Sequence, residues 1–465
     1  MKRVLSLILT VIIALSLCAC GGSNNEEKKP AGLQVGFGKV DITPNFSISL
    51  YGYGDYANRL SEGVVAKIYA TCIAMSENDQ TVLLYTLDLG ACHNGLADTL
   101  RIKVSAETGI PKENLFFAAT HTHSAPQAAV SNATGVELRY QQLLATATVD
   151  AAKEALADMA SATILSAQPE IEGMNFVRHY KMTDGTYAGS NFGTFTNKEI
   201  EGHATEGDHK MTLVKFDRPE GKEDILLVNW AAHPDHGNTI GRKNISPDYP
   251  GFMRDKIEAE TGMKVAFFSG ASGNMNPNSK IAEEKHGLDV KAYGEKLADL
   301  AVAALPTLAP VEGTGVKVAP VADVTLDVDH TWDHMVKEAE EVQNASNAEY
   351  ARLLCQQYDF SSDIHAGAII RRSKAAKTGE VPLRAFSVGG IGFVNYQHEM
   401  FSENGMYIKE NSPFAVTIIA TANYLYMASE AAYDYRSYEA DTGNFVKGSS
   451  EKLSEKFVEM LKSLA

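Results

Sequence analysis

Two histidines separated by one residue stand directly after a short apolar segment. The segment covers residues 115–119, and Thr120-His121-Thr122-His123-Ser124 follows it. Side chains at i and i+2 of an extended chain lie on the same face, so both imidazoles can point toward one ligand. Neutral imidazole is a common zinc ligand and a proton carrier near neutral pH. The spacing alone leaves a metal-binding pair, a catalytic pair and a structural pair open.

The ends of other apolar segments carry further candidates. His233 follows residues 225–231, and Glu399 follows residues 393–396. Another short strand leads into a glycine-rich segment, 269–278, whose backbone N–H groups can approach a ligand closely, although an ordinary loop has the same composition. Ligands of open α/β sheets bind beyond the carboxyl ends of the strands. Two histidines and a carboxylate from three strand ends fit a catalytic zinc site with one position left for water.

Strand-like and helix-like patterns alternate in the chain that must position these residues. We expect strands over 64–75, 81–89, 115–120, 211–216, 225–231, 265–268, 321–328, 384–388 and 392–396, and helices over 98–107, 150–159, 247–260, 290–304 and 333–358. Turns at 78–79, 220–221 and 389–390 join neighbouring strands as antiparallel pairs. The pattern predicts an α/β fold, a layered αβα domain with a mixed, partly antiparallel central sheet.

The composition excludes several classes of protein. The 465 residues include 42 Lys and Arg against 58 Asp and Glu, a net charge of −16, which argues against a nucleic-acid partner. Five cysteines are too few for a disulfide scaffold. We expect Cys72, Cys92 and Cys355 to be free thiols, with one disulfide left open. The isolated histidines are expected at the surface: His286, His330, His334 and His365.

The first residues resemble a bacterial lipoprotein signal. Lys2 and Arg3 precede an apolar run over 4–17, and Leu17-Cys18-Ala19-Cys20 then resembles a lipobox, with a plain secretory signal as the alternative. On this interpretation residues 1–20 are the signal peptide ending at Cys20, 21–32 a polar tether, and 33–465 one catalytic domain. We expect an exported protein at the bacterial cell surface or in the periplasm, attached to the membrane only through lipidated Cys20.

An ordered series of short motifs resembles the neutral/alkaline non-lysosomal ceramidase family, specifically its N-terminal catalytic domain. The motifs cover residues 35–44, 87–89, 120–124, 229–234, 245–251, 270–277, 399–402, 422–424 and 437–440. The resemblance implies one zinc ion per chain, held by His121, His233, Glu399 and Tyr438. It also implies hydrolysis of an amide, in N-acyl sphingosine or a related N-acyl compound, by a metal-activated water.

The same resemblance suggests roles for other residues. His123 would face the scissile group and protonate the leaving amine. Arg178 would orient the substrate, with a surface salt bridge as the alternative. Asp88 and Asp248 would orient metal ligands from outside the coordination sphere. The expected partner is a small-molecule or lipid substrate; a structural Ca²⁺ or Mg²⁺ and the oligomeric state stay open.

Two departures from the family pattern bear on the substrate. Asn276 stands where ceramidases carry a serine at the reaction centre, and a carboxamide forms hydrogen bonds but is no nucleophile. The chain also ends at Ala465 without the C-terminal immunoglobulin-like domain of better-known members. The alternatives are a zinc hydrolase of the same fold acting on an ester or glycan, and a non-catalytic binding lipoprotein. Barrel-type amidohydrolases and PHP-type phosphoesterases need a regular βα repeat, which the hairpins do not supply.

Overall fold

Strands that are buried on both faces organise this protein. The computed structural model describes residues 32–465 except 54–58, 129, 131, 194 and 196–198. Successive residues of the central strands belong to different hydrophobic clusters: Val82 and Leu84 lie in one cluster, and Leu83 and Tyr85 in another. Because side chains alternate along a strand, both faces of such a sheet must be covered by other elements.

These strands form three mixed sheets. The first has the order β5 (Leu115–Ala119), β4 (Gln80–Leu87), β3 (Tyr69–Glu77), β1 (Gln34–Asp41) and β6 (Ala160–Ser161). The second has the order β15 (Lys264–Ser269), β13 (Ile225–Trp230), β12 (Thr212–Asp217), β7 (Thr163–Ala167) and β17 (Ala309–Pro310). The third has the order β18 (Val316–Val318), β20 (Thr378–Val388), β21 (Ile391–Tyr396) and β23 (Val416–Thr421), with β19 (Ala322–Asp327) also paired to β20.

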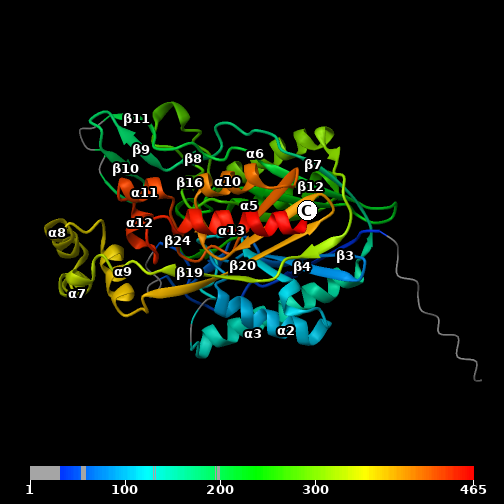
Figure 1. Cartoon of the computed structure of the whole chain (residues 1–465), viewed down its shortest axis with the longest axis horizontal. Helices are drawn as coiled ribbons and strands as arrows, with labels where there is room; N and C mark the ends of the chain where they lie inside the picture. Colours follow the sequence, from blue (N-terminus) through cyan, green and yellow to red (C-terminus); the bar gives the residue numbers. More distant parts are fainter. Residues whose placement is uncertain (1–31, 54–58, 129, 131, 194, 196–198) are drawn as a thin grey trace, which may run out of the picture. The chain divides into compact units, whose positions relative to one another are not determined.

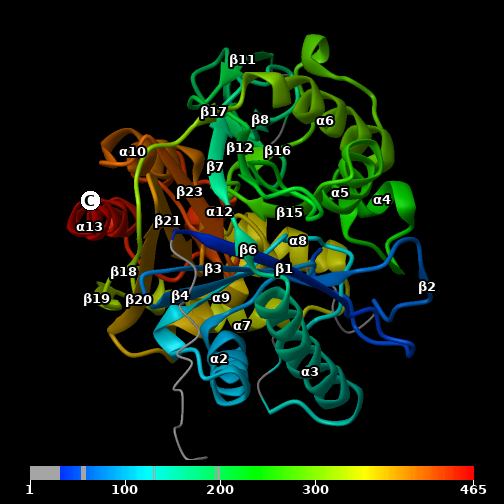
Figure 2. The ribbon, with the colours of Figure 1, turned by 90° about the vertical axis from the view of Figure 1, so that its right-hand side faces the viewer.

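The inner faces of the three sheets share one apolar core, and helices cover each outer face. Phe116, Leu227 and Phe393, one from each sheet, belong to this shared core. The covering helices are α2 (Asn94–Thr108) and α3 (Gly135–Ala157) on the first sheet, α5 (Asp248–Thr261) and α6 (Val290–Ala304) on the second, and α10 (Ser402–Asn411) and α13 (Ser449–Leu464) on the third. Figure 2 shows the three helix pairs on three sides of the strands.

Each sheet contains one parallel pair, and buried polar side chains tie these pairs to one another. The parallel pairs are β4/β5, β13/β15 and β21/β23. The Asn229 amide donates to Phe268 O and to Ile419 O of the third sheet, both at 2.9 Å. Asn395 donates to Phe117 O of the first sheet, and Thr86 to Phe267 O of the second. The carboxyl ends of all three pairs therefore meet at one place.

The predicted fold class is confirmed: helices and strands are mixed, and the strands run both parallel and antiparallel. The strands are divided over three sheets around a common core, an arrangement that the alternation of local patterns does not reveal. Several elements were missed, among them β1, β23, α10 and α13.

Two detailed expectations were wrong. The helix expected over 333–358 is broken into α7 (Val336–Gln343) and α8 (Ala348–Tyr358), because the Asn347 side chain caps a new helix by accepting from Tyr350 N–H. His365 is fully buried instead of exposed, since its ring packs against Trp332 and Phe360. The expectation of free thiols is confirmed, since Cys72, Cys92 and Cys355 are buried and unbridged.

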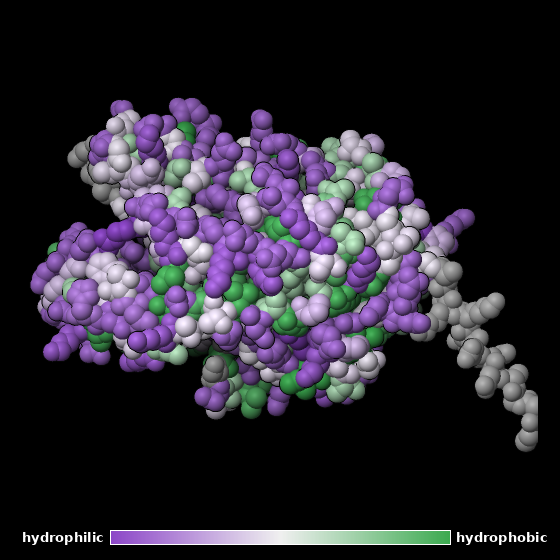
Figure 3. All heavy atoms as spheres, viewed as in Figure 1, coloured by the Kyte–Doolittle hydropathy of each residue, from purple (hydrophilic) through white to green (hydrophobic). Residues whose placement is uncertain are grey.

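Two smaller parts extend from the sheets at the same end of Figure 1. One is the sheet β9 (His179–Met182), β10 (Tyr187–Gly189) and β11 (Ile200–His203); the other is α7, α8 and α9 (Asp363–Ser373). The space-filling view is indented between them and is mostly hydrophilic on this face (Figure 3). Within the described residues, no helix is both long and apolar enough to span a membrane. The expected signal peptide and Cys20 lie outside the described residues.

Candidate metal centre

Three of the predicted ligands converge where the three sheets meet. His121 follows β5, His233 follows β13, and Glu399 begins β22 (Glu399–Met400), just after β21. The Nε2 atoms of His121 and His233 are 3.0 Å apart. Glu399 Oε2 lies 3.3 Å from the first of these nitrogens and 3.4 Å from the second. All three side chains are almost completely buried.

The hydrogen bonds of these groups leave three acceptor atoms directed at one another, an arrangement that could hold a cation. His121 Nδ1 lies 2.6 Å from Gly90 O, and His233 Nδ1 lies 2.8 Å from Ser272 O. A carbonyl oxygen only accepts, so both Nδ1 atoms carry the proton and both Nε2 atoms present a lone pair. Glu399 Oε2 is buried and has no hydrogen-bond donor. Three converging acceptor atoms that carry no proton could serve as ligands of a metal ion such as zinc.

His123 is the third imidazole at this place. Its Nε2 atom lies 3.3 Å from His121 Nε2, and the ring nitrogens of His121, His123 and His233 all lie within 4.8 Å of one another. Among the described residues, this is the one group of three or more His, Cys, Asp or Glu side chains with metal-ligand spacing. Burial lowers the pKa of His123 well below its usual value, and the neighbouring His121 adds to the effect. His123 is therefore neutral at neutral pH.

Backbone conformation explains how these imidazoles come together. His121 has φ of 69°, in the left-handed region that non-glycine residues rarely adopt, so this segment is not the regular extended chain assumed from the sequence. The glycine-rich loop after β15 contributes a carbonyl, Ser272 O, to His233 instead of the expected N–H donors. A Cβ on Gly273 would lie 2.8 Å from Glu399 O, so glycine is needed for this close approach.

Aromatic rings from residues 51 and 53 cover the outer side of His123. The centroids of the Tyr51 and Tyr53 rings lie 5.7 and 5.2 Å from the His123 ring, edge to face. The Tyr53 hydroxyl donates to Asp235 O, and the Arg59 guanidinium donates to His123 O. Sequence analysis missed these residues because no motif marks a loop that touches the site only in space.

Arg178 is part of a buried ion-pair network. Its Nε donates to Glu439 Oε1 at 2.8 Å, while Glu439 Oε2 lies 2.9 Å from His179 Nε2. Burial alone would raise the pKa of Glu439, but His179 and Arg178 outweigh it and lower the pKa to about 2. The surface salt bridge considered as the alternative for Arg178 is excluded, because both partners are almost completely buried. Arg178 Nη1 is directed at Asn276 Oδ1, 3.5 Å away.

Tyr438 begins α12 (Tyr438–Thr442), directly before Glu439. The ring of Tyr426 is a neighbour of both Tyr438 and the histidine cluster: its centroid is 5.9 Å from that of Tyr438 and 6.4 Å from that of His233. The Arg178 guanidinium also lies 5.4 Å from the Tyr426 ring. Tyr426 is a neighbour of the centre that the sequence motifs did not identify.

Asn276 lies at the edge of the centre, in the short strand β16 (Met275–Asn276) paired with β8 (Phe176–Val177). Its Nδ2 donates to Ser190 Oγ at 3.4 Å, and Ser190 lines a cavity of about 810 Å³ beside the β9–β11 sheet. Met275 O accepts from His233 N–H at 2.9 Å. Asn276 is therefore next in the chain to a residue that contacts His233, and its side chain contacts a residue that lines an open cavity.

The two carboxylates expected to orient ligands have other partners. Asp88 accepts from Tyr69 N–H and from Arg254 Nη1, both at 2.9 Å, and His121 Nδ1 is bound to Gly90 O instead. Asp248 accepts from His236 N–H at 3.0 Å and thus holds the loop that follows His233. Asp88 ties α5 to the first sheet, whereas Asp248 supports the centre through the backbone.

Comparison with known proteins gives a consistent result. Residues 33–300, more than half of the chain, match the family model of the neutral/alkaline non-lysosomal ceramidase N-terminal domain. The neutral ceramidase of Pseudomonas aeruginosa is 25% identical over 263 residues, which are 53% of this chain and 37% of that protein. The chain thus matches well under half the length of this curated relative.

Two solved structures share the fold. The crystal structure of neutral ceramidase from Pseudomonas aeruginosa superposes with a TM-score of 0.67 at 16% identity, covering 94% of this chain and 75% of the other. A ceramidase complexed with C2 gives a TM-score of 0.68 at 15% identity, with the same coverage. From the family match, the shared fold and the ordered motifs together, the chain belongs to the neutral/alkaline non-lysosomal ceramidase family of hydrolases.

Proposed function

We propose that this protein is a zinc-dependent hydrolase that cleaves the amide bond of an N-acyl compound, N-acyl sphingosine or a relative of it. The observation that carries the proposal is the convergence of two Nε2 lone pairs and one carboxylate oxygen within 3.4 Å, with no proton donor among them. His121, His233 and Glu399 would hold the zinc, with Tyr438 as the fourth ligand. Zinc at such a site supplies Lewis acidity and makes water nucleophilic near neutral pH.

The residues around the ligands can carry out the remaining chemistry. His123 is neutral, lies beside His121, and can take a proton from the attacking water and return it to the leaving amine. Arg178 Nη1 and the Asn276 carboxamide can orient the acyl or amine part of the substrate by hydrogen bonds. The cavity at Ser190 gives the substrate a way to approach Asn276.

The first experiment tests the metal and the division of roles. His233→Ala should lose zinc and hydrolysis together, whereas His123→Gln should keep zinc and lose turnover. Zinc content is measured by elemental analysis beside initial rates. If His123→Gln loses zinc, His123 is itself a metal ligand together with His121 and His233. Its role as proton carrier would then be refuted. A purified wild-type protein that binds no zinc would refute the proposal.

The second experiment tests the substrate. A panel of N-acyl sphingoid bases, N-acyl amino acids, carboxylic esters and N-acylated sugars is assayed with wild type and His233→Ala. We expect amides to be cleaved and esters of matched acyl length to be poorer substrates. Because Asn276 replaces a serine, a preference for an N-acyl compound other than ceramide is the second candidate. Hydrolysis of esters alone would refute the amidase proposal.

We also propose that the protein is exported and held at the membrane by a lipid on Cys20. The support is the lipobox-like sequence around Cys20 after a charged and apolar leader. Incorporation of labelled palmitate should be abolished by Cys20→Ala. Equal labelling of the variant would refute lipidation at this residue.

A further inference from the structure

The ion pair of Arg178 and Glu439 continues into a chain of hydrogen bonds. Glu439 Oε2 lies 2.9 Å from His179 Nε2, and His179 Nδ1 lies 2.8 Å from the hydroxyl of Tyr435. His179 begins β9, and Tyr435 directly follows α11 (Glu430–Asp434). These four side chains form what we call the arginine network: Arg178, Glu439, His179 and Tyr435.

The direction of each hydrogen bond follows from the charges in the network. Glu439 is ionised, so its Oε2 accepts from His179 Nε2–H. Arg178 already compensates the charge of this carboxylate, and a second cation would leave a net charge buried, so the imidazole of His179 is neutral. Its Nδ1 then accepts from the Tyr435 hydroxyl, which keeps its proton because burial raises the pKa of Tyr435.

The arginine network fixes the plane of the Arg178 guanidinium. Its Nε lies 2.8 Å and its Nη2 lies 2.5 Å from the same oxygen, Glu439 Oε1. Two contacts from one edge of a planar group determine its orientation only while that oxygen stays in place. The hydrogen bond from His179 to Oε2 prevents the carboxylate from turning. The remaining donor, Nη1, is thereby directed at Asn276 Oδ1, 3.5 Å away.

Aromatic stacking holds Tyr435 itself in place. Its ring lies 4.6 Å from the ring of Tyr187 in β10, with 15° between their planes. The Phe192 ring stacks at 6.1 Å and 13°, and Phe192 lines the cavity of about 810 Å³ that Ser190 also borders. The hydroxyl that binds His179 is therefore positioned by residues of the β9–β11 sheet and of the cavity wall.

We propose that His179 and Tyr435 are positioning residues, which hold Glu439 and through it direct Arg178 Nη1 toward a substrate bound beside Asn276. This inference rests on the proposed function, in which Arg178 orients the substrate. An orienting donor acts most strongly when it is held in the productive geometry before the substrate arrives. The alternative is a network that only stabilises the fold, and the tests below separate the two roles.

The first test needs no substrate. In the full chain labelled with ¹⁵N-arginine, the Nε–H signal of Arg178 is assigned by its absence from Arg178→Lys. Tyr435→Phe keeps the stacked ring and removes the hydroxyl, so this signal should shift and its proton should exchange about tenfold faster, as expected for the loss of one buried hydrogen bond. The matched control is Tyr433→Phe, which removes a hydroxyl bonded to Phe445 O at 2.7 Å and should leave the signal unchanged.

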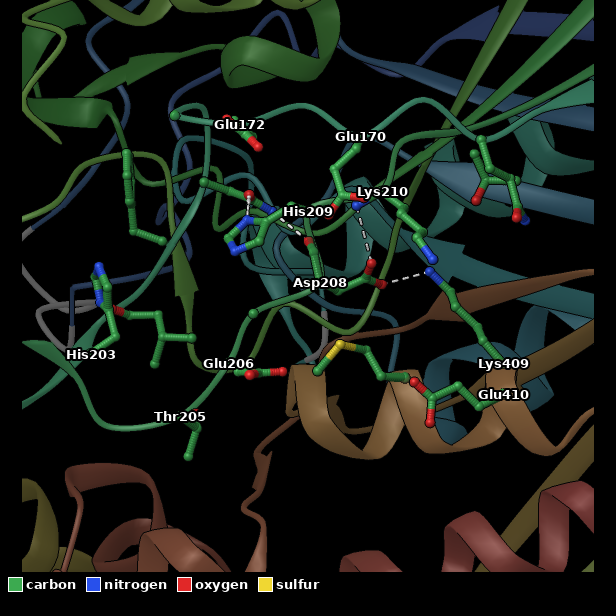
Figure 4. A pocket seen from close by; sticks show the side chains of 18 of the residues that line it. Glu170, Glu172, His203, Thr205, Glu206, Asp208, His209, Lys210, Lys409 and Glu410 are labelled. Atoms are coloured by element: carbon green, nitrogen blue, oxygen red, sulfur yellow. Dashed lines mark hydrogen bonds and ion pairs between the residues drawn. The ribbon is translucent and has the colours of Figure 1, made fainter.

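His209 offers the matched control for the imidazole. It is labelled in Figure 4, and its Nδ1 lies 2.7 Å from the side chain of Asn175, three residues before Arg178. His209→Leu thus removes an imidazole from a hydrogen bond to the same segment but outside the arginine network. We expect it to keep the Arg178 signal, whereas His179→Leu should lose the slow exchange.

The second test is kinetic and uses the amide that the wild type cleaves best. His179→Leu should lower kcat about ten- to a hundredfold and change KM less, since misplacing an orienting group acts mainly on the transition state. His179→Gln should restore most of kcat, because an amide can donate to Glu439 and accept from Tyr435. In Arg178→Lys, which has no planar fork to hold, Tyr435→Phe should have no further effect on kcat.

Three results would overturn the proposal. One is an Arg178 signal that is the same in the wild type, Tyr435→Phe and His179→Leu, which would show that the guanidinium is held without them. The second is a shift in Tyr433→Phe as large as in Tyr435→Phe, which would make the effect one of general stability. The third is an unchanged kcat in His179→Leu. Failure of the proposed function is seen separately, as a wild type that hydrolyses no amide while its Arg178 signal still responds to Tyr435→Phe.

Discussion

The metal centre predicts that Glu399→Gln is more stable than the wild type when metal is absent and less stable when zinc is present. In the absence of metal, Glu399 Oε2 is a buried acceptor 3.3 and 3.4 Å from two imidazole lone pairs. An unsatisfied buried acceptor costs about 1–3 kcal/mol. The NH₂ group of glutamine can donate to both nitrogens at the same distances. Metal-free Glu399→Gln should therefore be more stable than the metal-free wild type by about 1–3 kcal/mol.

With zinc the order should reverse. A ligand that binds only the folded state stabilises it by about 2.7 kcal/mol at 100 times its Kd. The wild type should gain at least this amount, while the variant, which has lost the anionic ligand, should gain much less. The assay is urea unfolding at pH 7.5, first with a chelator and then with excess zinc.

The control variant changes the same functional group at the surface of the protein. Glu455→Gln removes an exposed carboxylate from α13 and should change stability little in either condition. If, in the presence of the chelator, Glu399→Gln is less stable than the wild type, then Glu399 Oε2 is not an unsatisfied acceptor facing two imidazole lone pairs. The assigned ligand set is then refuted. Equal zinc stabilisation of both proteins would place the ion elsewhere.

Three further predictions concern buried groups outside the ligands. Arg254→Met should lower the free energy of unfolding by about 3–5 kcal/mol, because it leaves Asp88 as an unpaired buried carboxylate, and adding Asp88→Asn should restore much of this in a double-mutant cycle measured with urea. Burial raises the pKa of Asp441 from 3.8 to about 6; its contribution to stability is therefore complete below pH 3.8 and is lost as the pH rises through 6, by about 1.4 kcal/mol between pH 5 and 8. The free energy of unfolding of Asp441→Asn should therefore depend less on pH between about 5 and 8 than that of the wild type. An unchanged pH dependence would contradict the raised pKa of Asp441. Burial raises the pKa of the Cys72 thiol, and that of Cys92 to about 12, so neither should react with a thiol reagent before unfolding in a stopped labelling assay; rapid labelling of the native protein would contradict their burial.

Local patterns in the sequence were sufficient to predict which chemical groups follow each strand. The apolar runs before His121, His233 and Glu399 form strands because their side chains can be buried on both faces. The motifs that follow them identify the family without reference to distance. The free thiols and the mixed strand directions also follow from local composition and turns.

Only the tertiary structure decides which of these strand ends meet. Residues 121, 233 and 399 are separated by more than 100 positions, and the side chains that join their strands, Asn229 and Asn395, donate between sheets. Period and propensity describe one strand at a time, so they predict neither three sheets around one core nor the left-handed conformation of His121. The same limit applies to Asp88, whose partner Arg254 is on another element, and to Tyr426, which reaches His233 only through folding. Local sequence patterns thus predict which groups are available for catalysis, while long-range packing determines which of them are joined by a hydrogen bond, an ion pair or a common ligand.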